Sequence, residues 1–118
     1  MRTHHDLDVW KNSIHLVTLI YRATESFPKS EVYGITNQIR RSVVSIPSNI
    51  SEGAARTSLK EFTHFLSIAL GSIAELETQL IISKNLDYLN ESQFEKLISD
   101  LVSIRRMTLG LKKSINKV

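Results

Sequence analysis

Apolar residues recur along most of the chain at alternating steps of three and four, the spacing that places side chains on one face of an α-helix. The longest uninterrupted repeat follows Ser58, and Glu61 three residues later completes the spacing of a capping box. The repeat consists of Phe62, Leu66, Ala69, Ile73, Leu76 and Leu80. It predicts a helix that begins near Ser58 and ends between Asn85 and Asp87.

The same spacing predicts a helix on either side of this central part of the chain. The first covers about residues 6–25, with a main stripe of Leu7, Trp10, Ile14, Val17 and Tyr21 and a second stripe of Val9, Leu16 and Ile20 beside it. It should end at Phe27, because the residue before a proline is pushed out of the helical region. The last helix begins after Asn90, with Ser92 as a candidate cap, and reaches about Asn116. Its main stripe is Leu97, Leu101, Ile104, Leu111 and Ile115.

The remaining predicted helix begins between Lys29 and Thr36 and ends near Arg56. Its apolar residues are Ile39, Val43, Ile46 and Ile50. Because this spacing continues past Pro47, we favour one kinked helix over a break at Ile46. No segment shows the strict alternation of a strand. Short connections make neighbouring helices antiparallel, so we expect an all-α, up-down-up-down antiparallel four-helix bundle that forms a single domain over residues 1–118.

The third predicted helix carries more apolar side chains than one bundle face requires. Outside its main stripe it contains Phe65, Ile68, Leu70, Ala74, Ile81 and Ile82, and the first helix adds Leu19. Large exposed apolar patches usually mark contacts with other chains. These residues therefore predict a homo-oligomer. The alternative is a monomer with an ordinary scatter of exposed apolar residues.

Composition excludes several kinds of chemistry. The 118 residues contain no cysteine, which rules out disulfides, thiolate nucleophiles and cysteine metal sites and fits a reducing, cytoplasmic location. The N-terminal residues do not resemble a signal peptide. No stretch approaches the roughly 20 apolar residues of a membrane helix, so we expect no membrane association.

No arrangement of residues typical of an enzyme is found. Glu75 and Glu77 are two residues apart and point to different sides of a helix, so they cannot work as an acid–base pair. Glu61 and His64 match the Glu-x-x-His motif of di-metal bundles, but the match occurs only once. We therefore expect a protein without catalytic residues, without a metal site and without a cofactor.

Positive charge is distributed unevenly along a chain of formal net charge +3. No acidic residue follows Asp100, and Lys117 extends the basic end. The residues that could contact the phosphates of RNA or DNA are Arg40, Arg41, Arg56, Lys60, Arg105, Arg106, Lys112 and Lys113. If nucleic acid binds, we expect weak sequence selectivity and strong salt dependence. The alternative is that the basic end complements the helix dipole.

Polar residues also recur at helical spacing in the second and third predicted helices. We define the polar seam as Gln38, Arg41, Ser45, Asn49, Glu52 and Arg56 in the second helix and Ser72, Glu75 and Gln79 in the third. We interpret these as stripes that face each other or a neighbouring subunit and form paired contacts. A ligand or phosphate site at Arg41 and Arg56, or a solvated stripe, are the alternatives. Gly71 is expected to permit a close helix–helix approach.

One block of the chain, QIRRSVVSIPSNISEG at residues 38–53, is long and specific. With DLDVW at 6–10, FPKSEVYGI at 27–35 and FLSIALGSIAELETQL at 65–80, it resembles the bacterial four-helix-bundle family named after proteins encoded in intervening sequences of large-subunit ribosomal RNA genes. The resemblance spans nearly the whole chain. Ser42 and Ser51 depart from it, since alanine is common at both positions.

The resemblance implies a bundle that assembles as a ring, a homopentamer. The chain is also similar to the accessory protein of diversity-generating retroelements, a basic pentameric barrel that partners a reverse transcriptase and contacts nucleic acid. The implied function is a non-enzymatic accessory or assembly module that contacts nucleic acid or a nucleic-acid enzyme. A purely structural protein–protein oligomer is the alternative, and a small-molecule or metal site in a pore or core is a third possibility. The matching motif residues, expected to be structural or assembly residues first, are Gln38, Arg41, Ser45, Pro47, Asn49, Glu52, Gly53, Arg56, Gly71, Ser72, Glu75 and Gln79.

Overall fold

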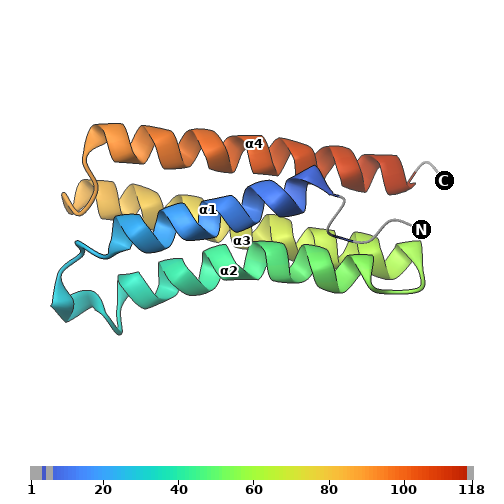
Figure 1. Cartoon of the computed structure of the whole chain (residues 1–118), viewed down its shortest axis with the longest axis horizontal. Helices are drawn as coiled ribbons and strands as arrows, with labels where there is room; N and C mark the ends of the chain where they lie inside the picture. Colours follow the sequence, from blue (N-terminus) through green and yellow to red (C-terminus); the bar gives the residue numbers. More distant parts are fainter. Residues whose placement is uncertain (1–3, 5–6, 117–118) are drawn as a thin grey trace.

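The computed structural model describes residue 4 and residues 7–116, and these form an elongated bundle of helices. Its elements are α1 (Asp8–Thr24), the 3-10 helix η2 (Lys29–Glu31), α2 (Ile35–Ala54), α3 (Leu59–Asn85) and α4 (Glu91–Asn116). Successive α-helices are joined at alternate ends of the molecule (Figure 1). The described part of the chain has no strand, and the all-α four-helix bundle is confirmed. Asp6 and Lys117, which belong to the predicted first helix and the predicted basic end, lie outside the described residues.

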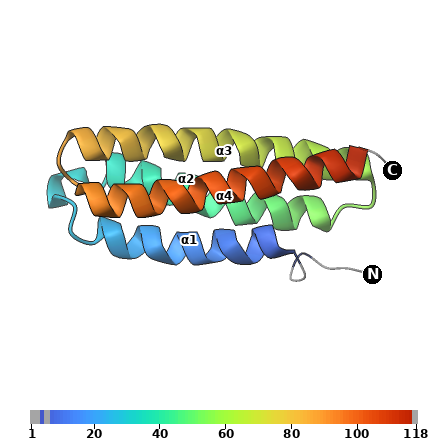
Figure 2. The same cartoon turned by 90° about the horizontal axis from the view of Figure 1, so that it is seen from above.

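Each helix packs against two neighbours, so the bundle has a square cross-section. Helices α1 and α3 both contact α2 and α4, and Figure 2 shows α1 and α3 on opposite sides of α4. Helix α2 passes through Pro47 without a break, as predicted. The fully buried core residues are Leu16, Ile20, Ile39, Val43, Ile46, Ile50, Leu66, Ala69, Leu76 and Leu80.

The core-facing side of α1 differs from the prediction. In the predicted main stripe, Ile14 and Tyr21 are 41% and 40% exposed, whereas the second stripe is buried. The buried residues of α1 are Val9, Ser13, Leu16, Ile20 and Thr24. The hydroxyls of Ser13 and Thr24 donate to carbonyls of their own helix at 2.9 and 2.8 Å. A hydroxyl that donates to its own helix can be buried at little cost, so Ser13 and Thr24 lie on the core face of α1 beside the apolar second stripe. The core face is therefore wider than the apolar residues alone indicate.

Both α3 and α4 begin at a capping residue. The predicted cap is confirmed at α3 and is wrong at α4. Ser58 Oγ accepts a hydrogen bond from the N–H of Glu61 at 3.1 Å, as predicted. At α4 the cap is Asn90 rather than Ser92. Its Oδ1 accepts from the N–H of Gln93 at 2.8 Å, and Gln93 Oε1 accepts from the N–H of Asn90 at 3.0 Å. This reciprocal pair satisfies two backbone donors, so the Ser92 prediction is wrong.

Helix α3 is the most apolar of the four helices. By length and mean hydropathy it is long and apolar enough to cross a membrane. However, Leu66, Ala69 and Leu76 on its main stripe are fully buried against the other helices. The buried stripe therefore accounts for part of this hydropathy, and one helix of this kind is weak evidence for a membrane span.

Candidate nucleic-acid surface and polar groove

Arg40 holds α2 against the end of α1. Its Nε donates to Thr24 Oγ1 at 2.9 Å and its Nη2 donates to the carbonyl of Tyr21 at 3.3 Å. The guanidinium also lies over the Tyr21 ring, 4.6 Å from its centroid. A cation beside the last carbonyls of a helix is favourable. The structure thus gives Arg40 a packing role, and its contact with nucleic acid stays a prediction.

Arg56 occupies the connection between α2 and α3. It forms an ion pair with Glu52 one turn earlier, its Nε lies 3.8 Å from Glu61 Oε2, and its guanidinium lies over the Phe65 ring. Lys60 is exposed nearby and lines a shallow hollow next to the last residues of α4. Two acidic neighbours already neutralise Arg56, so it is a weaker candidate for phosphate binding than the sequence predicts.

The C-terminal half of α4 carries positive charge that no acidic side chain balances. Arg105, Arg106 and Lys113 are exposed and Lys112 is half-buried. Among the described residues none of these four forms an ion pair. The helix dipole acts only within the last turn. It therefore accounts for Lys113, the basic residue of that turn, but not for Arg105, Arg106 or Lys112.

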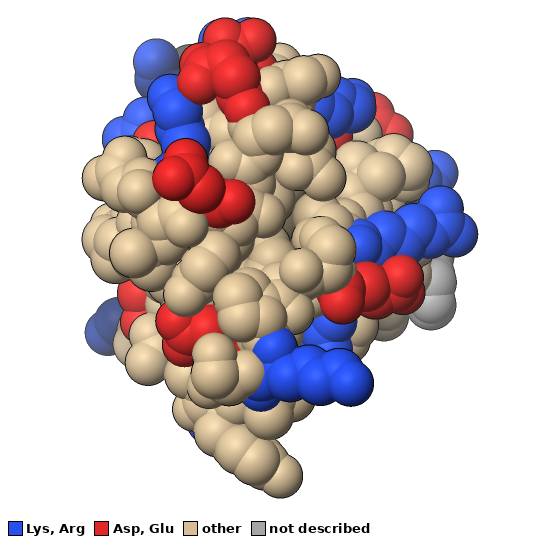
Figure 3. Space-filling view, turned by 90° about the vertical axis from the view of Figure 1, so that its left-hand side faces the viewer, with Lys and Arg blue, Asp and Glu red and all other residues tan. Residues whose placement is uncertain are grey.

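The opposite end of the bundle has a different charge distribution. Figure 3 shows acidic and basic side chains side by side over the end where α1 leads to α2 and α3 leads to α4. One such pair is Lys84 with Glu91, at 3.0 Å, and this contact lowers the pKa of the Glu91 carboxyl. This end of the bundle therefore carries charges of both signs, whereas the basic residues in the C-terminal half of α4 have no acidic partner among the described residues.

One half of the polar seam is joined by hydrogen bonds, both within α2 and from α2 to α3. Ser45 Oγ and Ser72 Oγ are 2.8 Å apart, and Asn49 Nδ2 donates to both the carbonyl and the hydroxyl of Ser45. Beyond them Gly53 lies so close to α3 that an added Cβ would be 2.8 Å from the Cβ of Phe65. We call this stretch the closed half of the α2–α3 interface.

The close approach occurs at Gly53 and not at Gly71, so the prediction for Gly71 is wrong. Gly71 is exposed, and a Cβ added there would meet no atom within 4 Å. The helical spacing explains the difference, because Gly71 lies on the side of α3 that faces away from the core. A glycine inside a helix does not by itself reveal which side of the helix it occupies.

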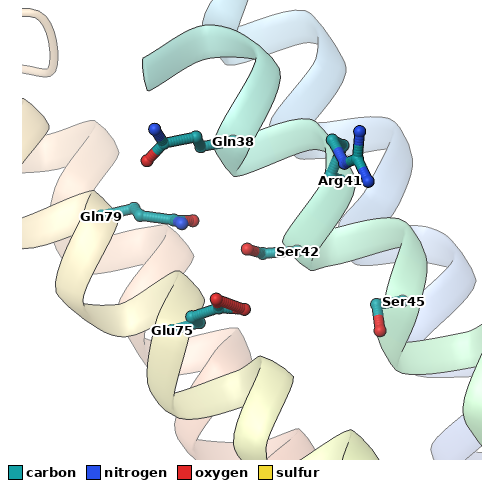
Figure 4. A pocket seen from close by; sticks show the side chains of 6 residues that line it. All are labelled: Gln38, Arg41, Ser42, Ser45, Glu75 and Gln79. Atoms are coloured by element: carbon teal, nitrogen blue, oxygen red, sulfur yellow. The ribbon is translucent and has the colours of Figure 1, made fainter. Parts of the chain in front are cut away.

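The other half of the polar seam lines an open groove of about 360 Å³ between the same two helices. Its lining residues are Gln38, Arg41, Ser42, Ser45, Glu75 and Gln79. Figure 4 shows Gln38 and Ser42 of α2 directed toward α3, and Glu75 and Gln79 of α3 directed toward α2. Gln79 is only 9% exposed, and its buried Oε1 has no hydrogen-bond partner among the described residues. We call this stretch the open half of the interface.

Beyond the open half, Glu31 links the start of α2 to the end of α3. The Tyr88 hydroxyl donates to Glu31 Oε2 at 2.9 Å, and the N–H of Ile35 donates to Glu31 Oε1 at 3.4 Å. The hydrogen bond to Glu31 raises the pKa of the Tyr88 hydroxyl. The groove is therefore open between two paired sections of the α2–α3 interface. No motif in the sequence marks the pair of Glu31 and Tyr88, because the two residues are 57 positions apart.

Part of the predicted apolar excess is exposed. Ile68, Ile81 and Ile82 are about two-fifths exposed, and Ala74 is exposed as well. In contrast, Leu19, Phe65 and Leu70 are partly covered within the bundle. Ile68 and Ile82 thus lie exposed on one side of α3 and Ile81 on another side, and exposed apolar side chains of this kind can be covered by another chain.

No group of three metal-ligating side chains comes together in the part of the chain that the structure describes. His64 is exposed, and its ring lies edge-on to Phe65. His64 therefore has no geometry that points to a ligand role.

Comparison with known proteins agrees with this fold. A family model described as 23S rRNA-intervening sequence protein matches residues 5–110. A search of curated proteins finds no match. Among solved structures, the chain is similar to a protein of unknown function from the S23 ribosomal protein family of Bacteroides thetaiotaomicron. The two are 25% identical, with a TM-score of 0.83 over 89% of this chain and 98% of that one.

Proposed function

The chain belongs to the 23S rRNA-intervening sequence protein family, and from this premise we propose that it is a non-enzymatic, oligomeric bundle that contacts nucleic acid through the basic side of α4. The observation that supports the proposal is the run of unpaired cations Arg105, Arg106, Lys112 and Lys113. Cations without acidic neighbours are free to replace the counterions of phosphates. We place the protein in the cytoplasm, where either RNA or DNA is available to it.

The chemistry of this surface points to backbone contact rather than base readout. Arginine and lysine bind phosphate oxygens, which position a protein on a nucleic acid but carry no sequence information. Val102 and Leu109 are exposed on the same stretch of α4, and neither can stack on a base as an aromatic ring does. We therefore expect binding that is weakly selective for sequence and strongly dependent on salt.

We also propose that copies of the chain assemble into a closed ring, a homopentamer, in which the exposed isoleucines of α3 are covered. The support is Ile68, Ile81 and Ile82 on the outer surface of α3, together with the family resemblance. Light scattering at micromolar concentration tests the assembly. A single species of 13.4 kDa would contradict it.

The test of nucleic-acid contact is a charge reversal on α4. Arg105→Glu with Arg106→Glu should weaken binding of single-stranded RNA and DNA oligonucleotides at least about tenfold and lower the salt slope by about two. The matched control is Arg22→Glu with Lys29→Glu, which removes the same positive charge from exposed residues at the opposite end of the bundle. The control should bind as the wild type does.

Two results would overturn the nucleic-acid role. One is an absence of binding at low salt, and the other is equal loss in the α4 variant and the control, which would reflect net charge alone.

The second candidate function is a purely structural oligomer whose partner is another protein, for example a reverse transcriptase. The exposed isoleucines of α3 favour it, because apolar contacts are less sensitive to salt than phosphate contacts. Co-purification with a protein partner that survives high salt, in the absence of nucleic-acid binding, would select this function instead.

A further inference from the structure

We infer that the open half of the α2–α3 interface binds a small zwitterion of the α-amino acid type, with its ammonium group at Glu75 and Gln79 and its carboxylate at Arg41. This site is separate from the basic side of α4, and on α3 its residue Glu75 lies seven residues from both Ile68 and Ile82. It goes beyond nucleic-acid contact and assembly.

The wall formed by α3 supplies hydrogen-bond acceptors. Gln79 Oε1 is buried without a partner among the described residues, and a buried acceptor in that state costs free energy until a donor reaches it. Glu75 lies one turn away on the same side of α3 and forms no ion pair in the structure. A carboxylate next to an amide oxygen is a suitable pair of acceptors for an ammonium group, which carries three donors.

The wall formed by α2 supplies the opposite charge. Arg41 is exposed at the rim of the groove and has neither an ion pair nor a hydrogen bond in the structure. Its guanidinium can bind a carboxylate through two parallel hydrogen bonds. Arg41 and Glu75 line the same groove from opposite helices and do not pair with each other (Figure 4). Figure 4 shows Ser42 opposite Glu75 and Arg41 farther along α2, so the groove has an anion on its α3 wall and a cation at its rim.

The size and lining of the groove select the class of ligand. A volume of about 360 Å³ is at the small end of ligand sites. No aromatic ring is among its lining residues, which disfavours a nucleobase, because bound bases usually stack on such rings. Because the groove is open to solvent, we expect a dissociation constant on the order of 0.1–1 mM.

The test is a titration of the full chain with each of the standard L-amino acids, followed by backbone amide NMR. At least one should cause saturable shifts at residues 38–45 and 75–79. Arg41→Gln and Gln79→Leu should each weaken that binding about tenfold. Arg22→Gln, which changes an exposed arginine outside the groove, is the matched control and should bind normally. The N-trimethyl analogue of the same amino acid keeps both charges but lacks N–H donors, so its binding should be lost.

Three outcomes would overturn the site. They are no saturable shift with any amino acid, equal binding by wild type and both groove variants, and a change in particle mass for Arg41→Gln or Gln79→Leu. The last result would mean that a second subunit covers the groove. Nucleic-acid binding by Arg41→Gln, measured in parallel, reports on the α4 surface and separates failure of this site from failure of the proposed function.

Discussion

Helices α2 and α3 contact each other in two different ways along their length. In the closed half, Ser45, Asn49 and Ser72 are joined by hydrogen bonds, and Gly53 lies directly against α3. In the open half, Arg41 and the Gln79 Oε1 line a groove, and neither has a hydrogen-bond or ion-pair partner in the part of the chain that the structure describes. The residue types are similar and the helical spacing is the same. The difference shows that polar residues at the same spacing on two facing helices need not pair, and that in the closed half pairing accompanies small residues at the contact.

The strongest way to break this comparison is to force the closed half apart. Gly53→Ala would place a Cβ 2.8 Å from Phe65 Cβ and 2.9 Å from Phe62 Cδ1. We expect the free energy of unfolding to fall by about 1–3 kcal/mol, because overpacking outweighs the gain in helix propensity. Chemical denaturation monitored by circular dichroism measures the change.

Gly71→Ala is the matched control, since a Cβ at that position meets open space. It should raise the stability of the monomeric bundle by up to about 1 kcal/mol through helix propensity. If both alanines have the same effect, the close approach at Gly53 does not limit the packing of α2 on α3.

The next largest effect should come from the hydrogen bonds of the closed half. Asn49→Ala removes both bonds to Ser45 and should cost about 1 kcal/mol of unfolding free energy, because Ser45 keeps its contact with Ser72. Ser48→Ala changes an exposed neighbour and should have little effect. Unchanged thermal stability and unchanged oligomeric state in Asn49→Ala would show that the paired seam is unimportant.

A change in the open half should behave in the opposite way. Gln79→Leu removes a buried oxygen that has no partner and replaces it with an apolar group of similar size. We expect stability to stay constant or to rise by up to about 1 kcal/mol. A loss comparable to that of Asn49→Ala, measured under the same conditions, would show that Gln79 is paired after all and that the two halves do not differ.

The smallest expected effect concerns Glu31 and Tyr88 beyond the open half. The hydrogen bond to Glu31 raises the pKa of Tyr88 above its ordinary value of 10.0. Its stabilising effect is therefore complete below pH 10.0 and lost as pH rises through the higher pKa of the folded state. Tyr88→Phe should remove this part of the alkaline pH dependence, whereas Tyr33→Phe, at a tyrosine that is 94% exposed, should keep it. Identical pH profiles for both variants would contradict the assignment.

The positively charged residues show a similar limit of sequence reasoning. Arg40 and Arg105 are both arginines of a basic chain, yet Arg40 donates to α1, while Arg105 forms no ion pair with any described residue. No local signal marks Arg40, because its partners Tyr21 and Thr24 lie on another helix. For Arg105 the signal was present, since no acidic residue follows Asp100.

The sequence by itself determined the four helices, their approximate ends and the unbroken passage of α2 through Pro47, because amphipathic spacing and capping depend on residues within a few turns. It also determined most of the core of α2, α3 and α4. Only the tertiary structure decided that α1 turns Leu16 and not Ile14 inward, that Gly53 rather than Gly71 permits close approach, and that the polar seam divides into a paired and an unpaired half. The physical reason is that these features depend on the distance between two backbones, and that distance results from the packing of all four helices together.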